Sequence, residues 1–256
     1  MQSLIIRAIQ PDILWENPTG NLEKLTELLM HAASGELIVL PEMFATGFSM
    51  QPEKIAQSMN GEIVSWMKEN SADKMVCGTV AIEDAGKYYN RFLACFKGEV
   101  VAIYDKRHLF SYASEDKHYT AGKTQTVFEY RGWKIKPLIC YDLRFPVWCR
   151  NWEEADLMIF CANWPSVRIN AWNTLLPARA IENQCYVLGV NRVGLDGYDN
   201  PHNGKSQLCD PLGVSNRKLN DEEQAFIFEI QNSEIQETRK QFPFLSDADE
   251  FNIFVK

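Results

Sequence analysis

The sequence has no long apolar run. Its 256 residues are 46% hydrophobic. No uninterrupted apolar stretch approaches the roughly 18 residues that suggest a membrane-spanning helix. The first residues, MQSLIIRAIQPDILW, also lack a basic leader followed by a long apolar core and a small-residue cleavage site. We therefore expect no membrane partner, no secretion signal and a cytoplasmic location.

Runs of like charge are also missing. Lys and Arg total 26 against 34 Asp and Glu, which gives a net charge of -8 at pH 7. Proteins that bind nucleic acid or anionic membranes usually carry a basic stripe, and this sequence shows none. It also lacks a G-x-G-x-x-G or phosphate-loop pattern. We therefore expect neither a nucleic acid nor a nucleotide as partner.

The cysteines form no recognisable framework. Seven are scattered at positions 77, 95, 140, 149, 161, 185 and 209, without a C-x-x-C pair. An odd and scattered set disfavours a disulfide scaffold and a zinc site, and it favours free thiols in a reducing cytoplasm. The spacing of His108, His118 and His202 does not suggest a metal site either.

No repeat and no Pro-, Gly- or Ser-rich linker divides the chain, which favours a single domain over residues 1–256. Strands are expected at Leu4 to Ile9, Glu36 to Leu40, Met75 to Ala81, Phe92 to Phe96, Val100 to Tyr104, Lys134 to Ile139, Leu157 to Cys161, Tyr186 to Asn191 and Ala225 to Ile230. Helices are expected at Asn21 to Ala33, Gly61 to Asn70, Val147 to Glu154 and Ile169 to Asn183, the last kinked or split by Pro177. The pattern predicts an α/β or α+β fold with helices outside one large mixed sheet or two sheets.

Three of the expected strands lead to a polar residue of a catalytic type. ELIVL runs through one proline to Glu42, VVAIY runs to Lys106, and the strand that starts near Lys134 ends at Cys140. Each residue alone has an ordinary explanation, as a surface acid, a solvated lysine and a small buried hydrophobe. Together they can form a nucleophilic site, because a carboxylate accepts the thiol proton and an ammonium lowers the thiol pKa.

The segments around these residues resemble the signature motifs of the nitrilase superfamily of carbon–nitrogen hydrolases. The matching segments, in the family's order, are LPEMFATGF with Glu42, YDKRHLF with Lys106 and LICYDLRFP with Cys140. SEDKHYTAG resembles the family's further acidic motif and places its second glutamate at Glu115. ANWP, ARAIENQCYVLGVNRVG and GKSQLCDPLG resemble the downstream pattern, so the resemblance spans most of the chain. The residues of these segments are most similar to those of the bacterial omega-amidase subgroup.

The resemblance implies a four-layer αββα sandwich with the site at the strand ends. It also implies a homodimer or higher homo-oligomer, because members of the superfamily commonly associate through a helical face. The strands and outer helices expected from the sequence are compatible with this layer order but do not predict it by themselves.

The resemblance and the chemistry of the residues together imply a cysteine-dependent amidase. Glu42 takes the proton of Cys140, whose sulfur attacks the terminal amide carbon, and Lys106 with the backbone N–H of Tyr141 stabilises the oxyanion. Ammonia leaves, and water activated by Glu42 hydrolyses the remaining thioester. Glu115 would hold Lys106 or the substrate amide by hydrogen bonding. Neither a metal nor an organic cofactor is required, so the partners are the small-molecule amide and water.

The omega-amidase resemblance implies a small dicarboxylate monoamide as substrate, such as 2-oxoglutaramate or 2-oxosuccinamate. Arg144, four residues after the nucleophile, is the first candidate to bind the free carboxylate, with a salt bridge to Asp142 as its alternative role. Trp164 and Phe48 are candidate pocket walls, although core packing is an equally expected role for both. Asn163 is a further candidate for substrate binding.

Three alternatives stay open. A nitrilase or an N-carbamoyl amino acid hydrolase would use the same Glu, Lys and Cys. A Cys-His arrangement with His108 as base is conceivable, but nothing in the local sequence supports it. A binding or assembly protein that kept the fold and lost turnover is the third, and the intact set of Glu42, Lys106, Glu115 and Cys140 argues against it.

Overall fold

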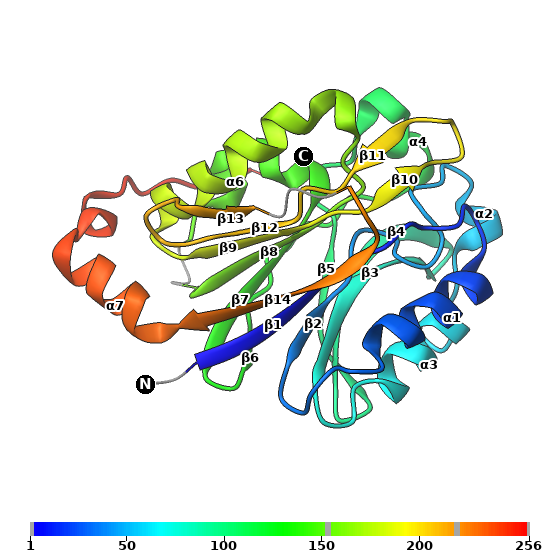
Figure 1. Cartoon of the computed structure of the whole chain (residues 1–256). Coiled ribbons are helices and arrows are strands. Elements are labelled where there is room, and N and C mark those ends of the chain that lie inside the picture. The colour runs from blue at the N-terminus through cyan, green and yellow to red at the C-terminus, as the bar shows by residue number, and fades with distance from the viewer. Residues whose placement is uncertain (1–2, 152–154, 218–220, 255–256) are drawn as a thin grey trace.

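The computed structural model describes residues 3–151, 155–217 and 221–254, and its strands form two large sheets packed face to face (Figure 1). The first sheet has the order β14-β1-β2-β3-β4-β5, and the second has the order β13-β12-β9-β8-β7-β6. The strands of the first sheet are β1 Ser3–Gln10, β2 Leu37–Val39, β3 Met75–Asp84, β4 Lys87–Phe96, β5 Glu99–Asp105 and β14 Gln224–Gln231. Those of the second are β6 Phe128–Tyr130, β7 Trp133–Ile139, β8 Leu157–Cys161, β9 Tyr186–Val190, β12 Gln207–Cys209 and β13 Ser215–Arg217.

Both sheets are mixed, as the sequence predicted, and their strand directions determine where the site lies. In the first sheet β1, β2 and β3 are parallel, while β3, β4 and β5 pair antiparallel in succession. Strand β5 therefore runs in the same direction as β2 and β3. In the second sheet β7, β8 and β9 are parallel. The residues that follow β2 and β5 therefore lie at the same end of the first sheet. Those that follow β7 and β8 lie at the same end of the second sheet.

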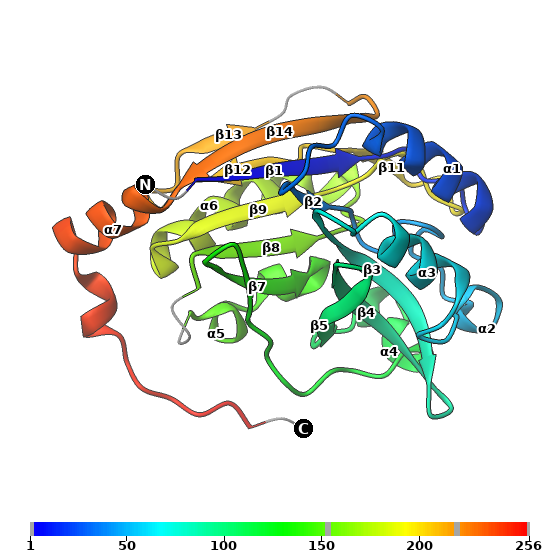
Figure 2. The ribbon, with the colours of Figure 1, turned by 90° about the horizontal axis from the view of Figure 1, so that it is seen from below.

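Helices cover the outer faces of both sheets and complete the four layers (Figures 1 and 2). Helices α1 and α3 lie on the first sheet and α6 lies on the second, whereas α7 extends from one end of the sandwich. The helices are α1 Pro18–Leu29, α2 Pro52–Ile55, α3 Glu62–Glu69, α4 Glu115–His118, α5 Pro146–Cys149, α6 Ile169–Asn183 and α7 Asn232–Gln241.

Alternation along the central strands divides the core into two clusters. In β2, Leu37 and Val39 pack between the sheets, whereas Ile38 packs against the residues of α1 and α3. Val76 of the neighbouring β3 also belongs to the helix-side cluster. All four side chains are fully buried. A register slip by one residue would exchange the two faces, so burial on both sides fixes the register.

The observed helices correct three expectations. Helix α1 begins at Pro18, earlier than Asn21, because Asn17 caps it and proline suits a first turn. Helix α6 runs unbroken from Ile169 to Asn183, so Pro177 does not split it. The helix expected from Val147 to Glu154 is a single turn that ends at Cys149, and the end of the expected range lies outside the described residues.

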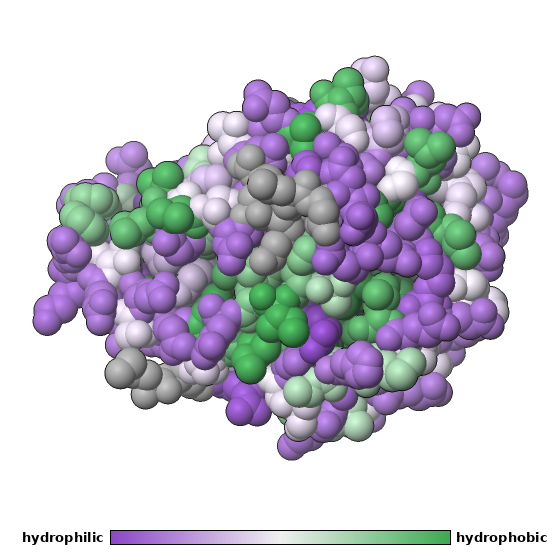
Figure 3. All heavy atoms as spheres, viewed as in Figure 1, coloured by the Kyte–Doolittle hydropathy of each residue, from purple (hydrophilic) through white to green (hydrophobic). Residues whose placement is uncertain are grey.

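The two-stranded hairpin of β10, Val193–Leu195, and β11, Pro201–Asn203, has no counterpart among the expected elements. Strands β6, β12 and β13, each of three residues, were also missed, because so short a strand carries little periodic signal. No helix in the described ranges combines the length and the apolar character needed to cross a membrane. The face shown in Figure 3 is largely hydrophilic, with apolar side chains gathered near its middle.

Candidate active site

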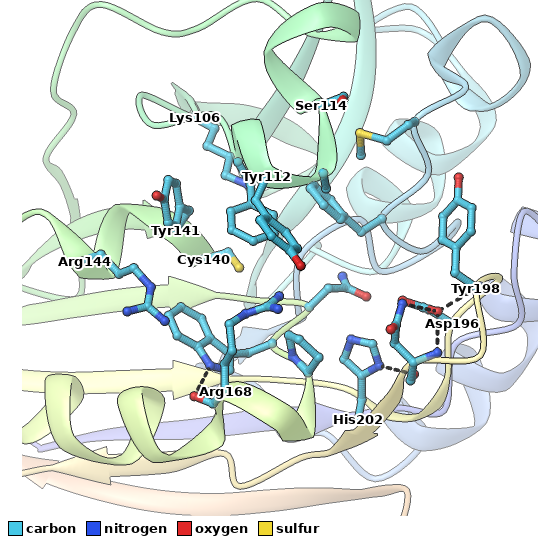
Figure 4. A pocket seen from close by; sticks show the side chains of 18 residues that line it. Lys106, Tyr112, Ser114, Cys140, Tyr141, Arg144, Arg168, Asp196, Tyr198 and His202 are labelled. Carbon is cyan, nitrogen blue, oxygen red and sulfur yellow. Dashed lines mark hydrogen bonds between the residues drawn. The ribbon is translucent and has the colours of Figure 1, made fainter.

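Three strand ends bring a glutamate, a lysine and a cysteine to the same edge of the sandwich. Glu42 follows β2, Lys106 follows β5 and Cys140 follows β7. The Nζ atom of Lys106 lies 2.7 Å from Oε1 of Glu42. Lys106 and Cys140 both line a cavity of about 440 Å³ (Figure 4). The structure thus brings together three residues that are far apart in the chain.

Glu115 completes a buried ion cluster around Lys106. It is the first residue of α4, and its Oε2 atom lies 2.9 Å from Nζ of Lys106. The same oxygen accepts a hydrogen bond of 2.6 Å from the backbone N–H of Phe110. The side chains of Glu42, Lys106 and Glu115 are all 0% exposed. One ammonium is therefore held between two carboxylates, shielded from bulk solvent.

Asn90 joins the two carboxylates, and the sequence analysis missed it. Its Nδ2 donates to Oε1 of Glu42 at 2.8 Å and to Oε1 of Glu115 at 3.2 Å. Its Oδ1 accepts a hydrogen bond of 2.8 Å from the hydroxyl of Thr79. Asn90 belongs to β4, which starts earlier than the expected strand from Phe92 to Phe96. The available signal was an amide within a β-rich run of aromatic and aliphatic residues.

Cys140 has an unusual backbone conformation. It begins the 3-10 turn Cys140–Arg144, and its φ of 43° lies in the left-handed region that residues with a side chain rarely occupy. Asp142 braces this turn. Its Oδ2 accepts hydrogen bonds from the backbone N–H of Ile139 at 3.0 Å and from the hydroxyl of Tyr104 at 2.7 Å. The nucleophile candidate is thus held by a network that does not itself line the cavity.

Asp142 also decides two roles that the sequence left open. Its Oδ1 accepts hydrogen bonds from the backbone N–H of His108 at 3.0 Å and from Nδ1 of the same residue at 2.8 Å. Asp142 therefore pairs with His108, and the alternative salt bridge between Asp142 and Arg144 is not formed. The His108 ring stacks on Phe145 with centroids 3.7 Å apart, and it is not among the described residues that line the cavity. His108 is therefore not placed as a base for Cys140.

Burial and opposite charge act against each other at Lys106. Burial alone lowers the pKa of an ammonium, but the carboxylates of Glu115 and Glu42 together outweigh this effect and raise the pKa of Lys106. Burial raises the pKa of Glu115, Lys106 lowers it, and the charge of Glu42 raises it again. Two carboxylates thus share one buried ammonium.

The thiol of Cys140 is held in its neutral form. Burial raises its pKa well above the usual 9.0, and the negative charge of Glu42 raises it further. Lys106 lowers the pKa of Cys140, as expected from the sequence, but its contribution is outweighed. A thiol in this form can act as a nucleophile only where a nearby base accepts its proton.

The β10–β11 hairpin and the loop between its strands build the opposite side of the cavity (Figure 4). The carboxylate of Asp196 accepts hydrogen bonds from the backbone N–H groups of Tyr198 and Asn200, both at 2.9 Å. Nδ1 of His202 lies 3.0 Å from the carbonyl oxygen of Asn200. Burial and the nearby charge of Arg192 lower the pKa of His202 to about 4. The imidazole is therefore neutral near pH 7.

Two arginines line the cavity (Figure 4). The guanidinium carbon of Arg168 lies 5.0 Å from the ring centre of Phe110, and that of Arg144 lies 5.1 Å from the ring centre of Trp164. No acidic side chain in the described part of the chain lies within ion-pair distance of either arginine. Arg168 is half-buried and Arg144 is exposed. Arg168 was not predicted from the sequence, because a single arginine in a loop carries no periodic signal.

The other residues expected in the site also border the cavity. The ring centre of Phe48 lies 4.8 Å from Nζ of Lys106. Trp164 is 3% exposed and combines cavity lining with core packing. The backbone N–H of Asn163 donates to Oε2 of Glu42 at 2.9 Å. Across the described ranges, no group of three or more His, Cys, Asp or Glu side chains is placed to hold a metal ion.

Comparisons with known proteins support the resemblance to carbon–nitrogen hydrolases. A family model for carbon-nitrogen hydrolases matches residues 5–240. Omega-amidase YafV of Escherichia coli (strain K12) is 41% identical over 258 residues, which cover 99% of this chain and 100% of that protein. The 2-oxoglutaramate amidase of Bacillus subtilis (strain 168) is 34% identical, with 94% of this chain and 96% of that protein covered.

Solved structures share the fold. A CN-hydrolase superfamily protein from Xanthomonas campestris, with an arsenic adduct in its active site, superposes with a TM-score of 0.94 at 39% identity and covers 99% of this chain and 100% of its own. Nit3 of Saccharomyces cerevisiae, a member of the nitrilase superfamily, has a TM-score of 0.85 at 22% identity, with 94% of this chain and 95% of that chain covered. The αββα fold implied by the resemblance is confirmed, and the chain belongs to the carbon–nitrogen hydrolase family.

Proposed function

We propose that this protein hydrolyses the terminal amide of small dicarboxylate monoamides, such as 2-oxoglutaramate and 2-oxosuccinamate, to the acid and ammonia. The observation that carries the proposal is the ammonium of Lys106, which is held by Glu42 and Glu115 in a cavity that also exposes Cys140. The names of the omega-amidase and 2-oxoglutaramate amidase relatives support this substrate class.

The first step is the attack of Cys140 on the amide carbon. The sulfur forms a bond to this carbon while its proton passes to Glu42, and the carbonyl electron pair moves onto oxygen. Glu42 is the better candidate for the base because, of the two cluster carboxylates, its charge raises the thiol pKa more. Lys106 bonds the same carboxylate at 2.7 Å and holds it in place.

Two donors are available to the developing oxyanion. Lys106 uses its ammonium to bind Glu42 and Glu115, and its third N–H is left for a group in the cavity that it lines. Tyr141 lies in the first turn of the 3-10 segment that starts at Cys140. The first backbone N–H groups of such a turn have no acceptor within it, so that of Tyr141 is suited to this role.

The intermediate then collapses, and the resulting thioester is hydrolysed. The oxyanion re-forms the carbonyl, the C–N bond breaks, and the nitrogen takes the proton from Glu42 and departs as ammonia. Glu42 next takes a proton from water, whose oxygen attacks the thioester carbon. Collapse releases the sulfur of Cys140, which recovers its proton from Glu42, together with the product acid. No proton or electron is gained or lost by the protein over the cycle.

Glu115 is assigned the role of positioning residue in this scheme. It reaches Lys106 at 2.9 Å, and the charge of Glu115 is the largest of the contributions that raise the lysine pKa. It therefore keeps Lys106 protonated, with its ammonium placed for the oxyanion. Asn90, which donates to both carboxylates, keeps the two carboxylates in a fixed relation.

Arg168 and Arg144 form the proposed receptor for the substrate carboxylate. A guanidinium grips a carboxylate through two parallel hydrogen bonds, and neither arginine has an acidic partner among the described residues. Asp196, also in the cavity wall, is engaged by the backbone of its own hairpin. Arg168 should contribute more than Arg144, because it is less exposed and its charge is less screened.

Ammonia release from a panel of substrates tests the proposal. The panel contains 2-oxoglutaramate, 2-oxosuccinamate, aliphatic nitriles and N-carbamoyl amino acids, and each is assayed with the wild type and with Cys140→Ala. We expect the two monoamides to be turned over fastest and the variant to be inactive. Cys95→Ala, which changes a thiol buried in β4 beneath the helices, is the matched control and should retain turnover. Faster hydrolysis of nitriles or N-carbamoyl compounds would contradict the substrate class.

We further propose that two copies associate through the face formed by α5 and α6. Val147 of α5 is 52% exposed and Ile181 of α6 is 56% exposed. Arg150 donates to the carbonyl of Glu182, which ties the two helix ends together. Light scattering should give twice the chain mass for the wild type and the single chain mass for Ile181→Glu. A monomeric wild type, or an equal effect of Met30→Glu at the exposed residue that follows α1, would contradict this interface.

A further inference from the structure

A buried acceptor borders the cavity without a partner. Asn163 is 6% exposed and lines the cavity together with Lys106 and Cys140. Its Nδ2 donates to the backbone carbonyl of Glu42, while its Oδ1 has no hydrogen-bond partner among the described residues. Turning the amide over would set its oxygen against that carbonyl oxygen, so the chemistry fixes which atom is left over. Buried polar atoms are rarely unpaired, so a donor is expected from a ligand.

The side chain that carries the unpaired oxygen is tied to the proposed base. Both the backbone N–H and the side-chain Nδ2 of Asn163 donate to Glu42, one to its carboxylate at 2.9 Å and the other to its carbonyl. Asn163 follows β8, which pairs in parallel with β7, the strand that leads to Cys140. The acceptor is therefore tied to the proposed base and lies beside the strand that carries the nucleophile.

Only one part of the proposed substrate can serve this acceptor. The carbonyl oxygen and the carboxylate both need donors, and these are supplied by Lys106, the Tyr141 backbone and Arg168. The amide nitrogen alone carries N–H groups. We propose that Oδ1 of Asn163 accepts a hydrogen bond from the amide N–H of the substrate and so holds the leaving nitrogen beside Glu42. The inference rests on the proposed function and names a specificity-determining residue for it.

This hydrogen bond should make the site prefer an amide, whose nitrogen carries an N–H group, over analogues that lack one. An ester places an oxygen, and a nitrile places a nitrogen without hydrogen, where the amide would place its donor. Both leave the buried oxygen of Asn163 unpaired, and a site with an unpaired buried polar group discriminates strongly against such analogues. A residue that merely supports Glu42 would affect amides and esters alike.

Two variants separate these roles. Asn163→Ser keeps a hydroxyl that can donate to the Glu42 carbonyl, but its shorter side chain withdraws the acceptor from the cavity. Asn163→Asp keeps an acceptor oxygen and loses the donor. The readout is the amide-to-ester ratio of kcat/KM, measured with the best amide of the panel and the methyl ester of the same acid. We expect this ratio to fall at least about tenfold in Asn163→Ser and to stay within about threefold of the wild type in Asn163→Asp.

Equal losses on amide and ester in Asn163→Ser, or no loss on either, would overturn the proposal. If thermal unfolding shows that this variant does not fold, Asn163→Ala takes its place with the same expectation. Choosing the amide by its activity keeps this test apart from the proposed substrate class. A preference for uncharged amides would contradict the carboxylate receptor, whereas an unchanged amide-to-ester ratio would contradict the role of Asn163.

Discussion

Two groups of charges at the cavity are held in different ways. Glu42, Lys106 and Glu115 are fully buried and bonded to one another at the ends of strands and the start of a helix. Arg168 and Arg144 lie against aromatic rings, on short turns, with partial or full exposure. Bond making needs fixed geometry, which the sheets supply, whereas the proposed carboxylate receptor can rely on longer and more mobile side chains.

The largest effect that distinguishes the two groups of charges is expected from Lys106→Met. It leaves two buried carboxylates without their cation, which should lower the free energy of unfolding by about 3–5 kcal/mol and turnover by at least about 10³-fold. The stability loss should shrink as the pH falls, because burial raises the pKa of Glu115 and a protonated carboxyl no longer needs the cation. Denaturant unfolding at pH 7 and pH 5, with ammonia release, measures both effects.

The control for this variant is Arg91→Met, which breaks the ion pair of Arg91 with Asp105 at 2.7 Å. Asp105 is partly exposed, so this variant should lose less stability and keep its turnover. Equal losses of stability and turnover in Lys106→Met and Arg91→Met would contradict the larger contribution expected from the fully buried cluster.

Arg168→Met should give the next largest effect, and this effect should fall on KM rather than on kcat. Removing a charged donor pair should raise KM for 2-oxoglutaramate about 10- to 100-fold and change kcat little, because the carboxylate is bound equally in the ground and transition states. KM for the uncharged butyramide should change by less than about threefold, and stability by less than about 0.5 kcal/mol. Steady-state kinetics on both amides checks this.

The matched variant for that measurement is Arg144→Met, whose exposed guanidinium should contribute a smaller change in the same direction. If Arg168→Met impairs butyramide as much as 2-oxoglutaramate, the arginine does not act on the carboxylate, and the proposed division between the two groups of charges fails.

A third prediction concerns His202, which lines the described part of the cavity wall. The pKa of His202 is lowered from 6.5 to about 4, mainly by burial, so its neutral form is favoured in the folded state. The resulting stability is present above pH 6.5 and is lost as the pH falls towards 4, by about 3 kcal/mol in total. His202→Gln should therefore flatten the acid limb of a plot of unfolding free energy against pH. An unchanged slope would refute this.

The smallest expected effect comes from Thr79→Val, at the back of the buried cluster. Thr79 donates to Asn90 and accepts from the backbone N–H of Met43, both at 2.8 Å. Loss of the Thr79 hydroxyl should lower the free energy of unfolding by about 1–2 kcal/mol. It should also lower kcat severalfold, because Asn90 no longer holds the carboxylates firmly. Thr19→Val at an exposed position of α1 is the control and should change stability by less than about 0.5 kcal/mol. A kcat equal to the wild type would show that the support is dispensable.

The predictable and unpredictable residues of the site differ in how they are placed. Glu42 and Cys140 follow apolar strands, and a polar residue at the end of such a run stands out in the sequence. Asn90 lies within a strand and meets Glu42 only because β4 pairs with β3 and the chain folds Glu42 over it. Arg168 enters the cavity from a short turn, and no pattern in the sequence marks where that turn points.

Helix α6 likewise has one feature that the sequence predicted and one that it did not. Its bounds, Ile169 and Asn183, were predicted from the apolar spacing. Pro177 does not split the helix, because Trp172 and Leu176 are both fully buried against the second sheet. Packing of an apolar face stabilises a helix more than one lost backbone hydrogen bond destabilises it.

The sequence by itself determined the longer strands, helices α1, α3 and α6, the mixed sheets and the order of the candidate residues, because these follow from local spacing and from motifs a few residues long. Only the tertiary structure decided that Lys106 lies between two carboxylates, that Asp142 serves His108 rather than Arg144, and that Asn163 keeps an unpaired oxygen at the cavity. The physical reason is that hydrogen bonds and ion pairs between distant segments depend on sheet pairing and layer packing, which a linear pattern does not encode.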